Sequence, residues 1–305
     1  MDYSKLIDDE IWRFIRETDA HYPPDAVNRT VAEQRQVYDT MCRAFFAGYP
    51  DGLNVRDDAI DGIPIRLYEP AKPKGTVVYF HGGGFVVGGL DSHDDVCAEI
   101  SDQTGLRVVS VDYRLCPEHP HPAAFEDAVT AVLYASQVWD EPLVLAGDSA
   151  GGNLTAAVCH TLRGSVQIAG QVLIYPGLGG DMTKGSYIDH ANAPMLTMDD
   201  LKFYSAIRFE TPPNAPDPTA APLEDTDFSD LPPTVSITAQ CDPLADDGMT
   251  YRDAILAAGG KAVWFNEAGL VHGYLRARHQ SDRARRSFAR IVDQITMLAQ
   301  GEWHH

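Results

Sequence analysis

The chain of 305 residues and 33.4 kDa is long enough for one large α/β domain with a small appendage. Its formal net charge of −20 and isoelectric point near 4.7 argue against nucleic acid and anionic membrane surfaces as partners, because like charges repel. Five scattered cysteines without a C-x-x-C pair, no apolar secretory signal and no run long enough for a membrane span predict free thiols in a cytoplasmic protein without a zinc site.

The first 50 residues predict two helices. Ile11 and Phe14 recur at helical spacing in the first, and Thr30 with Glu33 has the form of a capping box that begins the second. The sequence then changes to extended pairs over residues 54–70. We therefore expect a helical segment followed by strands.

From residue 76 onward, strands rich in β-branched residues alternate with helices. The predicted strands are 76–80, 106–112, 143–146, 170–175, 234–239 and 261–265, and the predicted helices are 123–139, 152–163, 244–258 and 281–299. This alternation is typical of a mostly parallel sheet with helices on both faces.

The alternation stops between residues 177 and 231, where only a helix over 198–209 is predicted. We therefore expect a helical cap built from two segments. The predicted organisation is an N-terminal helical cap segment over 1–50 and a core over 51–305, with a cap insertion at about 178–230.

A sharp strand-to-helix turn, Gly147-x-Ser149-x-Gly151, lies at the centre of the predicted chemistry. Glycines are needed on both sides because a Cβ two residues before or after the serine would collide with neighbouring backbone. The turn holds the Ser149 hydroxyl outward beside the N–H groups of a helix N-terminus. A phosphate-binding Walker loop would need a lysine, which this turn lacks. A glycine-rich turn without chemistry is the alternative.

A serine hydroxyl needs a base, and histidine suits the task because its ordinary pKa is about 6.5. Ligands of parallel sheets gather beyond the carboxyl ends of strands. His272 follows the strand 261–265 in a predicted loop, and Asp242 follows the strand 234–239. We therefore predict Ser149 as nucleophile, His272 as base and Asp242 as the carboxylate that orients the imidazole.

Other histidines and acids fit these roles less well. His279 lies in polar sequence at the start of a helix, and His160 lies on the helix after the serine, too far along it. Asp246 and Asp247 fall at the start of a helix, where acids favour the positive end of the dipole, and we interpret them as capping or supporting groups.

Three glycines in His81-Gly-Gly-Gly directly follow the strand 76–80. Backbone N–H groups without a neighbouring Cβ can approach a substrate oxygen closely. We expect the N–H groups of Gly83, Gly84 and Ala150 to form an oxyanion hole, and His81 to hold the loop.

Two further acids lie near these motifs. Glu118 is either a buried acid near the serine turn or half of a surface ion pair with Arg114, and both interpretations stay open. Asp148 is interpreted as a residue that fixes the turn by local hydrogen bonds.

Together these motifs resemble the bacterial hormone-sensitive-lipase-like (family IV) carboxylesterases, which have the α/β-hydrolase fold. The resemblance covers about residues 74–275, with Ser, Asp and His in the family's order. The motifs that carry it are His81-Gly-Gly-Gly-Phe, Tyr113-Arg-Leu-Cys-Pro-Glu-His119, Phe125-Glu-Asp127, Gly147-Asp-Ser-Ala-Gly-Gly-Asn153, Leu231-Pro-Pro, Asp242-Pro-Leu and His272-Gly-Tyr. Within the family, Glu33-Gln-Arg-Gln and Gly88-Gly-Leu-Asp-Ser-His-Asp94 are most similar to the acetyl esterases.

The resemblance implies a serine esterase that hydrolyses short-chain (acetyl to butyryl-like) carboxylic esters through an acyl-enzyme, without metal or cofactor. It implies a triad of Ser149, Asp242 and His272, and a small-molecule ester as partner; whether the chain forms a homodimer stays open. Cys116 departs from the family pattern, which usually has alanine there. The alternatives are an amidase or arylformamidase on the same scaffold and a non-catalytic ligand-binding homologue. The filled triad counts against the latter.

Overall fold

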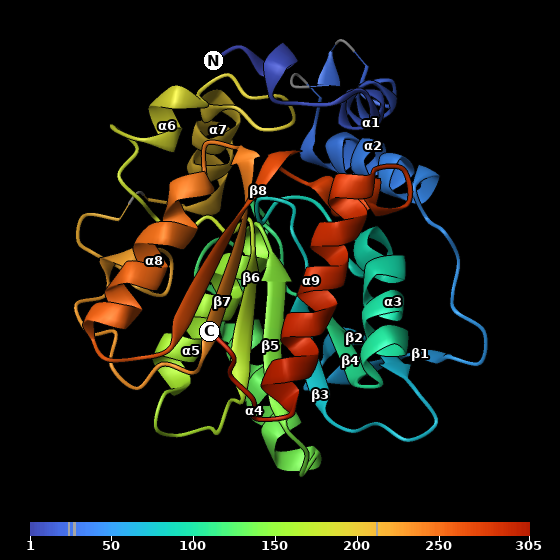
Figure 1. The fold of residues 1–305 in the computed structure, drawn as a ribbon, viewed down its shortest axis with the longest axis vertical. Helices are drawn as coiled ribbons and strands as arrows, with labels where there is room; N and C mark the ends of the chain where they lie inside the picture. Colours follow the sequence, from blue (N-terminus) through green and yellow to red (C-terminus); the bar gives the residue numbers. More distant parts are fainter. Residues whose placement is uncertain (24, 27–28, 212) are drawn as a thin grey trace.

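A mostly parallel sheet forms the centre of the protein. The computed structural model describes residues 1–23, 25–26, 29–211 and 213–305 (Figure 1). In this described part, an eight-stranded sheet has the order β1-β2-β4-β3-β5-β6-β7-β8. The strands are β1 (Asn54–Ile60), β2 (Ile63–Glu69), β3 (Thr76–Phe80), β4 (Arg107–Val111), β5 (Leu143–Asp148), β6 (Gly170–Ile174), β7 (Thr234–Cys241) and β8 (Ala262–Val271). Strand β2 runs antiparallel to both of its neighbours, β1 and β4, and all other neighbouring pairs are parallel.

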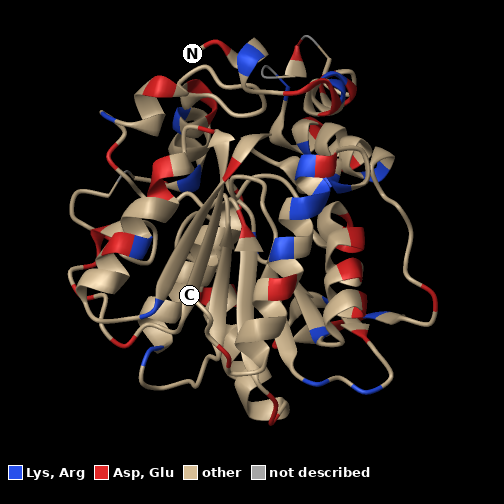
Figure 2. Ribbon diagram, in the orientation of Figure 1, with Lys and Arg blue, Asp and Glu red and all other residues tan. Residues whose placement is uncertain are grey.

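Helices cover both faces of this sheet. The α-helices are α1 (Asp9–Asp19), α2 (Val31–Ala44), α3 (Asp94–Thr104), α4 (Ala123–Val138), α5 (Ala150–Leu162), α6 (Ser186–Asp189), α7 (Met198–Arg208), α8 (Ala245–Ala257) and α9 (Asp282–Ala299). Short 3₁₀ helices are η1 (Tyr3–Lys5), η3 (Leu90–His93), η4 (Pro222–Glu224) and η5 (Tyr274–His279). Figure 2 shows that charged residues lie mainly on helices and loops, and strands β3, β6 and β7 carry none.

The alternation of side chains along β3 explains the two cores. Val77 and Tyr79 belong to the core cluster that contains residues of α1, α3 and α9, whereas Val78 and Phe80 belong to the cluster that contains residues of α4 and α5. All five residues of β3 are buried, as expected for a central strand with helices on both sides. The predicted α/β fold with a parallel sheet is therefore confirmed.

Local signals begin both N-terminal helices. Asp8 accepts a hydrogen bond from the Ile11 N–H at the start of α1 (3.0 Å). At the start of α2, Thr30 and Glu33 form the predicted capping box, with the Glu33 carboxylate 2.9 Å from the Thr30 nitrogen. Ile11 and Phe14 are fully buried, which confirms the predicted apolar face.

Two elements differ from the sequence-based expectation. Strand β8 continues beyond residue 265 to Val271, so His272 directly follows a strand instead of lying in a loop. A register shift against β7 between Ala239 and Cys241 allows this continuation. Helix α3 was not expected, because acidic residues interrupt its apolar pattern; it ends at Gly105, whose φ of 69° suits a left-handed cap.

Two segments that are far apart in sequence lie beyond the carboxyl ends of the parallel strands. In Figure 1, α1 and α2 (blue) and α6 and α7 (yellow) lie at the upper edge of the sheet. We call these helices the cap. Among the described helices, none combines the length and apolar character needed to cross a lipid bilayer.

Candidate active site

Three side chains form a hydrogen-bonded row at the ends of three parallel strands. Ser149 follows β5, Asp242 follows β7 and His272 follows β8. Nε2 of His272 lies 2.8 Å from Ser149 Oγ, and its Nδ1 lies 2.7 Å from Asp242 Oδ2. Asp242 is fully buried, and its second oxygen accepts the Leu244 N–H at 2.9 Å. In this arrangement the imidazole could take a proton from the Ser149 hydroxyl, and the carboxylate fixes the orientation of the ring.

The turn that carries Ser149 has a strained backbone. Ser149 adopts a φ of 54°, which is uncommon for a residue with a Cβ. A Cβ at Gly147 would overlap the carbonyl of Gly151, and a Cβ at Gly151 would overlap the carbonyl of Phe80. Only glycine fits at both positions, as expected from the Gly-x-Ser-x-Gly pattern.

The glycine loop after β3 lies beside the serine. Gly83 and Gly84 have φ values of 133° and 60°, and the Val86 and Val87 N–H groups both donate to the Gly83 carbonyl at 3.0 Å. Within the described part of the chain, the N–H groups of Gly83 and Gly84 have no backbone acceptor. The Ala150 N–H, at the start of α5, belongs to the first turn of a helix, where N–H groups lack helical acceptors.

Asp148 connects the serine turn to the glycine loop. Its carboxylate accepts hydrogen bonds from the Gly82 N–H (3.0 Å), the Tyr79 hydroxyl (2.8 Å) and the Tyr175 hydroxyl (3.3 Å), and lies 3.2 Å from His93 Nε2. Burial opposes ionisation, but His93 and the hydrogen bonds hold the Asp148 pKa well below its usual range. The expectation of local hydrogen bonds was wrong, because these partners lie on other strands and loops.

His81 points into the core instead of the site. Its ring stacks on Tyr113 with centroids 4.3 Å apart, and its Nδ1 lies 2.8 Å from the Gly82 carbonyl oxygen. Burial lowers the His81 pKa to about 4, so the ring is neutral at physiological pH. These contacts agree with a residue that holds the loop.

Glu118 has neither of its two expected roles. Its carboxylate is exposed and pairs with Arg35 at 2.6 Å, whereas Arg114 pairs with Asp127 at 2.8 Å. Arg35 also donates to the carbonyls of Val86 and Cys116, both at 2.8 Å. Arg35 thereby fastens cap helix α2 to the loop that begins at His81.

A cavity of about 1510 Å³ connects the row of side chains to the cap. Ser149 and His272 line it, as do Gly83, Gly84 and Ala150; Asp242 lies behind His272. The cap contributes residues that sequence reasoning missed, among them Tyr38, Tyr204 and Arg208. The helical periodicity of the sequence does not identify them as cavity residues, because it does not show which face of a helix turns toward a cavity.

Arg208 of α7 is held without a carboxylate partner in the described residues. Its guanidinium donates to the Ala220 carbonyl (3.1 Å) and to Asn153 Oδ1 (3.2 Å) and lies against the ring of Phe85. Burial lowers the Arg208 pKa to about 10, so the group stays charged at neutral pH. Arg208 thus links the cap to the loop after β3, which contains Phe85, and to helix α5, which follows Ser149.

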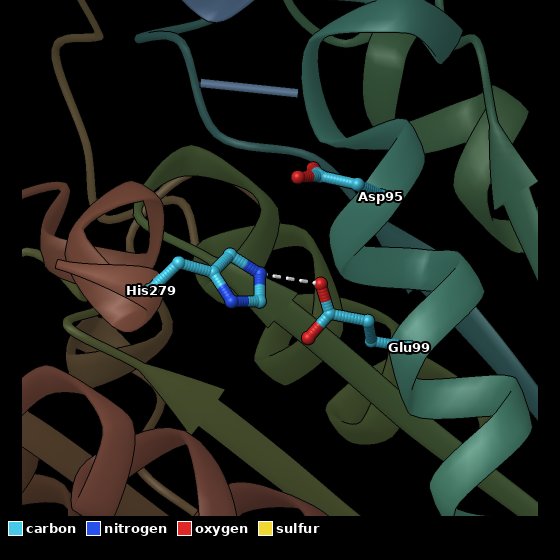
Figure 3. Close-up of side chains that lie close together, drawn as sticks. All are labelled: Asp95, Glu99 and His279. Atoms are coloured by element: carbon cyan, nitrogen blue, oxygen red, sulfur yellow. Dashed lines mark hydrogen bonds and ion pairs between the residues drawn. The ribbon is translucent and has the colours of Figure 1, made fainter. Parts of the chain in front are cut away.

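A second cluster of titratable groups lies outside the cavity lining (Figure 3). Figure 3 shows Asp95 and Glu99 on α3 facing His279 of η5, with ligand atoms that all lie within 4.8 Å of one another. Arg278 lies at 2.6 Å from both carboxylates. The cluster is therefore an ion-pair network between α3 and η5, in which Arg278 offsets part of the negative charge of the two carboxylates.

Comparisons with known proteins show the family to which the chain belongs. A protein-family model described as alpha/beta hydrolase fold matches residues 77–276. Esterase LipI of Mycobacterium tuberculosis is 39% identical over 245 residues (73% of this chain and 75% of the relative), and acetyl esterase of Salmonella typhi is 28% identical over 88% of each chain. The solved esterase of Pyrobaculum calidifontis superposes with a TM-score of 0.84 at 34% identity, over 91% of this chain and 95% of that one. The chain therefore belongs to the hormone-sensitive-lipase-like family of the α/β-hydrolase fold and is a carboxylic ester hydrolase.

Proposed function

We propose that the protein hydrolyses esters with short acyl groups, acetyl to butyryl-like, through an acyl-enzyme on Ser149. The observation that carries this proposal is the row Asp242–His272–Ser149, with distances of 2.7 and 2.8 Å, at the wall of the cavity. The similarity to a relative named acetyl esterase supports the acyl range.

The proposed reaction has two halves. Ser149 Oγ attacks the ester carbonyl carbon while His272 Nε2 takes the hydroxyl proton, and Asp242 stabilises the resulting imidazolium. The carbonyl oxygen becomes an oxyanion that accepts hydrogen bonds from the Gly83, Gly84 and Ala150 N–H groups. His272 then gives its proton to the alcohol oxygen, the C–O bond breaks, and the acyl group stays on Oγ. A water molecule, deprotonated by His272, hydrolyses this acyl-enzyme in the second half.

The position of Tyr204 supports a short acyl group. His272 must protonate the leaving oxygen, so the alcohol extends on the His272 side and the acyl group on the opposite side, toward α7. A Cβ placed at Gly84 would lie 2.5 Å from Tyr204 Cδ1, so the tyrosine ring packs directly against the oxyanion loop. Burial raises the Tyr204 pKa to about 12, which keeps this wall uncharged. We infer that the ring ends the acyl side of the cavity.

A chain-length profile tests the proposal. The wild-type protein should hydrolyse p-nitrophenyl acetate and butyrate much faster than the decanoate, and Ser149→Ala should lower these rates by about four to six orders of magnitude. Tyr204→Ala should move the optimum to longer acyl chains. Retention of more than a few per cent of activity in S149A would remove Ser149 from the mechanism, whereas a wild-type preference for decanoate would contradict only the acyl range.

A further inference from the structure

Arg276 is a cation at the active site that the proposed mechanism does not use. It belongs to η5, follows His272 by four residues and lines the cavity together with Ser149. Its Nη1 lies 3.6 Å from the position that a Cβ would take at Gly273. The guanidinium is therefore beside the residue that follows the catalytic histidine.

This guanidinium has no carboxylate within ion-pair distance among the described residues. Arg278, two positions later, pairs with both Asp95 and Glu99 at 2.6 Å. Arg276 instead donates from Nη2 to the Tyr38 hydroxyl, and its buried Nε has no partner in the described part of the chain. A partly buried guanidinium without a paired anion is unfavourable, so a ligand that supplies the anion would relieve this cost.

The chemistry of the reaction assigns Arg276 to the alcohol side of the cavity. His272 Nε2 must lie beside the leaving oxygen when it delivers its proton, so the alcohol extends past His272. Arg276 lies beside Gly273, the residue after His272, and its guanidinium carbon is 5.0 Å from the centroid of the Tyr38 ring. An aromatic face and the Nη1 end of a cation, which has no hydrogen-bond partner in the described part of the chain, are thus available to the leaving group.

The other charges of the cavity would orient an anion toward Arg276. The acids that line it lie on α1, on α7 or in the segment after α7: Asp19, Asp199, Asp200, Glu210, Asp217 and Glu224. Asp148 is also near, but its carboxylate is bound to Gly82, Tyr79 and His93. Of the other lining cations, Arg208 is bound to Asn153 and Ala220, and Lys202 pairs with Asp199 at 2.9 Å.

We propose that Arg276, with the Tyr38 hydroxyl, binds a carboxylate on the alcohol part of the substrate, so that the preferred substrates are short-chain esters of hydroxy acids. This inference rests on the proposed function, because it assigns the leaving group of that reaction. The planar guanidinium matches the two oxygens of a carboxylate and would orient the ester for attack by Ser149.

The test compares two aryl acetates that differ in charge, 4-acetoxybenzoate and the neutral 4-acetoxybenzamide. The ratio of their kcat/KM values is measured in wild type, Arg276→Gln, Arg276→Lys and Lys202→Gln, so that differences between the leaving groups cancel. R276Q should lower the ratio by about 10- to 100-fold, mainly through KM of the carboxylate ester, and R276K should lower it less. K202Q, which removes another lining cation, should leave it unchanged.

An unchanged ratio in R276Q, or an equal loss in K202Q, overturns the proposal. A second measurement needs no variant: 4-hydroxybenzoate should inhibit wild-type hydrolysis of p-nitrophenyl acetate more strongly than 4-hydroxybenzamide does, and equal inhibition also overturns it. Failure of the proposed function has a different signature, because neither aryl acetate would then be hydrolysed in a reaction that depends on Ser149.

Discussion

The guanidinium carbon of Arg208, at the end of cap helix α7, lies 3.7 Å from the centroid of the Phe85 ring. Phe85 directly follows the three glycines of the proposed oxyanion loop, and the same guanidinium hydrogen-bonds Asn153 of α5, four residues after the proposed nucleophile Ser149. Because one side chain contacts both the glycine loop and α5, we expect the position of the cap and the geometry of the oxyanion loop to be coupled.

Replacing Arg208 by glutamine should therefore affect both stability and turnover. The change removes a cation–π contact and charge-assisted hydrogen bonds, which together contribute about 2 to 4 kcal/mol. We expect the free energy of unfolding to fall by that amount and kcat/KM for p-nitrophenyl acetate to fall at least about tenfold. Urea unfolding and initial rates measure the two effects.

Arg290→Gln is the matched control for this prediction. Arg290 lies on α9, outside the cavity lining, and its guanidinium carbon is 4.6 Å from the centroid of the Phe265 ring. R290Q should lose stability without losing kcat. If R208Q kept the turnover of R290Q, the cap would not be coupled to the oxyanion loop.

Asp242 is predicted to act by orienting the imidazole of His272. Asp242→Asn keeps the shape of the side chain but replaces an acceptor with an amide, which favours the wrong tautomer of His272. We expect kcat to fall by about three to four orders of magnitude with little change in KM. A kcat within about tenfold of wild type, in a protein with unchanged circular dichroism, would remove Asp242 from the triad.

The tight contact between Gly84 and Tyr204 predicts that Gly84→Ala is harmful for two separable reasons. Alanine at a φ of 60° costs about 1 to 2 kcal/mol, and its Cβ would also collide with the Tyr204 ring. We expect G84A to lower kcat at least about tenfold, and Tyr204→Ala in the same chain to restore part of it. Stopped-flow or steady-state rates with p-nitrophenyl acetate measure both.

Gly105→Ala separates strain from collision. Gly105 has a similar φ of 69°, but a Cβ there meets nothing within 4 Å. G105A should lower stability by about 1 kcal/mol and leave kcat unchanged. If the double variant G84A/Y204A were no more active than G84A, the ring would not be the obstacle.

The hydrogen-bonded row of Ser149, His272 and Asp242 was predictable because each residue obeys a local requirement. Ser149 needs glycines two positions away on both sides, and His272 and Asp242 need only to follow strands, which β-branched residues indicate. These requirements involve few residues close in sequence. They do not depend on how distant elements pack.

The cavity-facing arginines and the full length of β8 were not predictable in this way. Arg208 and Arg276 occur in polar helical sequence, where an arginine usually faces solvent, and only the packing of the cap turns them toward the substrate side. Strand β8 continues to Val271 because β7 pairs with it after a register shift, and this depends on the partner strand. The partners of Asp148 and Glu118 were missed for the same reason, since they lie on distant elements.

The buried carboxyl of Asp247 should make the free energy of unfolding depend on pH. This carboxyl, in the first turn of α8, accepts the Leu178 N–H at 2.7 Å and contacts the Tyr187 hydroxyl at 3.0 Å, so it joins α8 to the cap insertion. Burial raises the Asp247 pKa to about 7 from an ordinary value of 3.8, and the hydrogen bonds offset only part of this rise. Between these two values the folded protein holds a proton that the unfolded chain has lost.

The free energy of unfolding should therefore fall as the pH rises from 3.8 toward about 7, by at most about 1.4 kcal/mol per pH unit. Above that range the contribution of the Asp247 carboxyl should no longer change with pH. Asp247→Asn keeps an acceptor for the Leu178 N–H but cannot ionise. The free energy of unfolding of D247N minus that of wild type should thus grow over the same range, which urea unfolding at about pH 5, 6, 7 and 8 would measure. Asp246→Asn, which removes a carboxylate from the same helical turn, is the control; an equal change of slope in D246N would show that the effect does not come from Asp247.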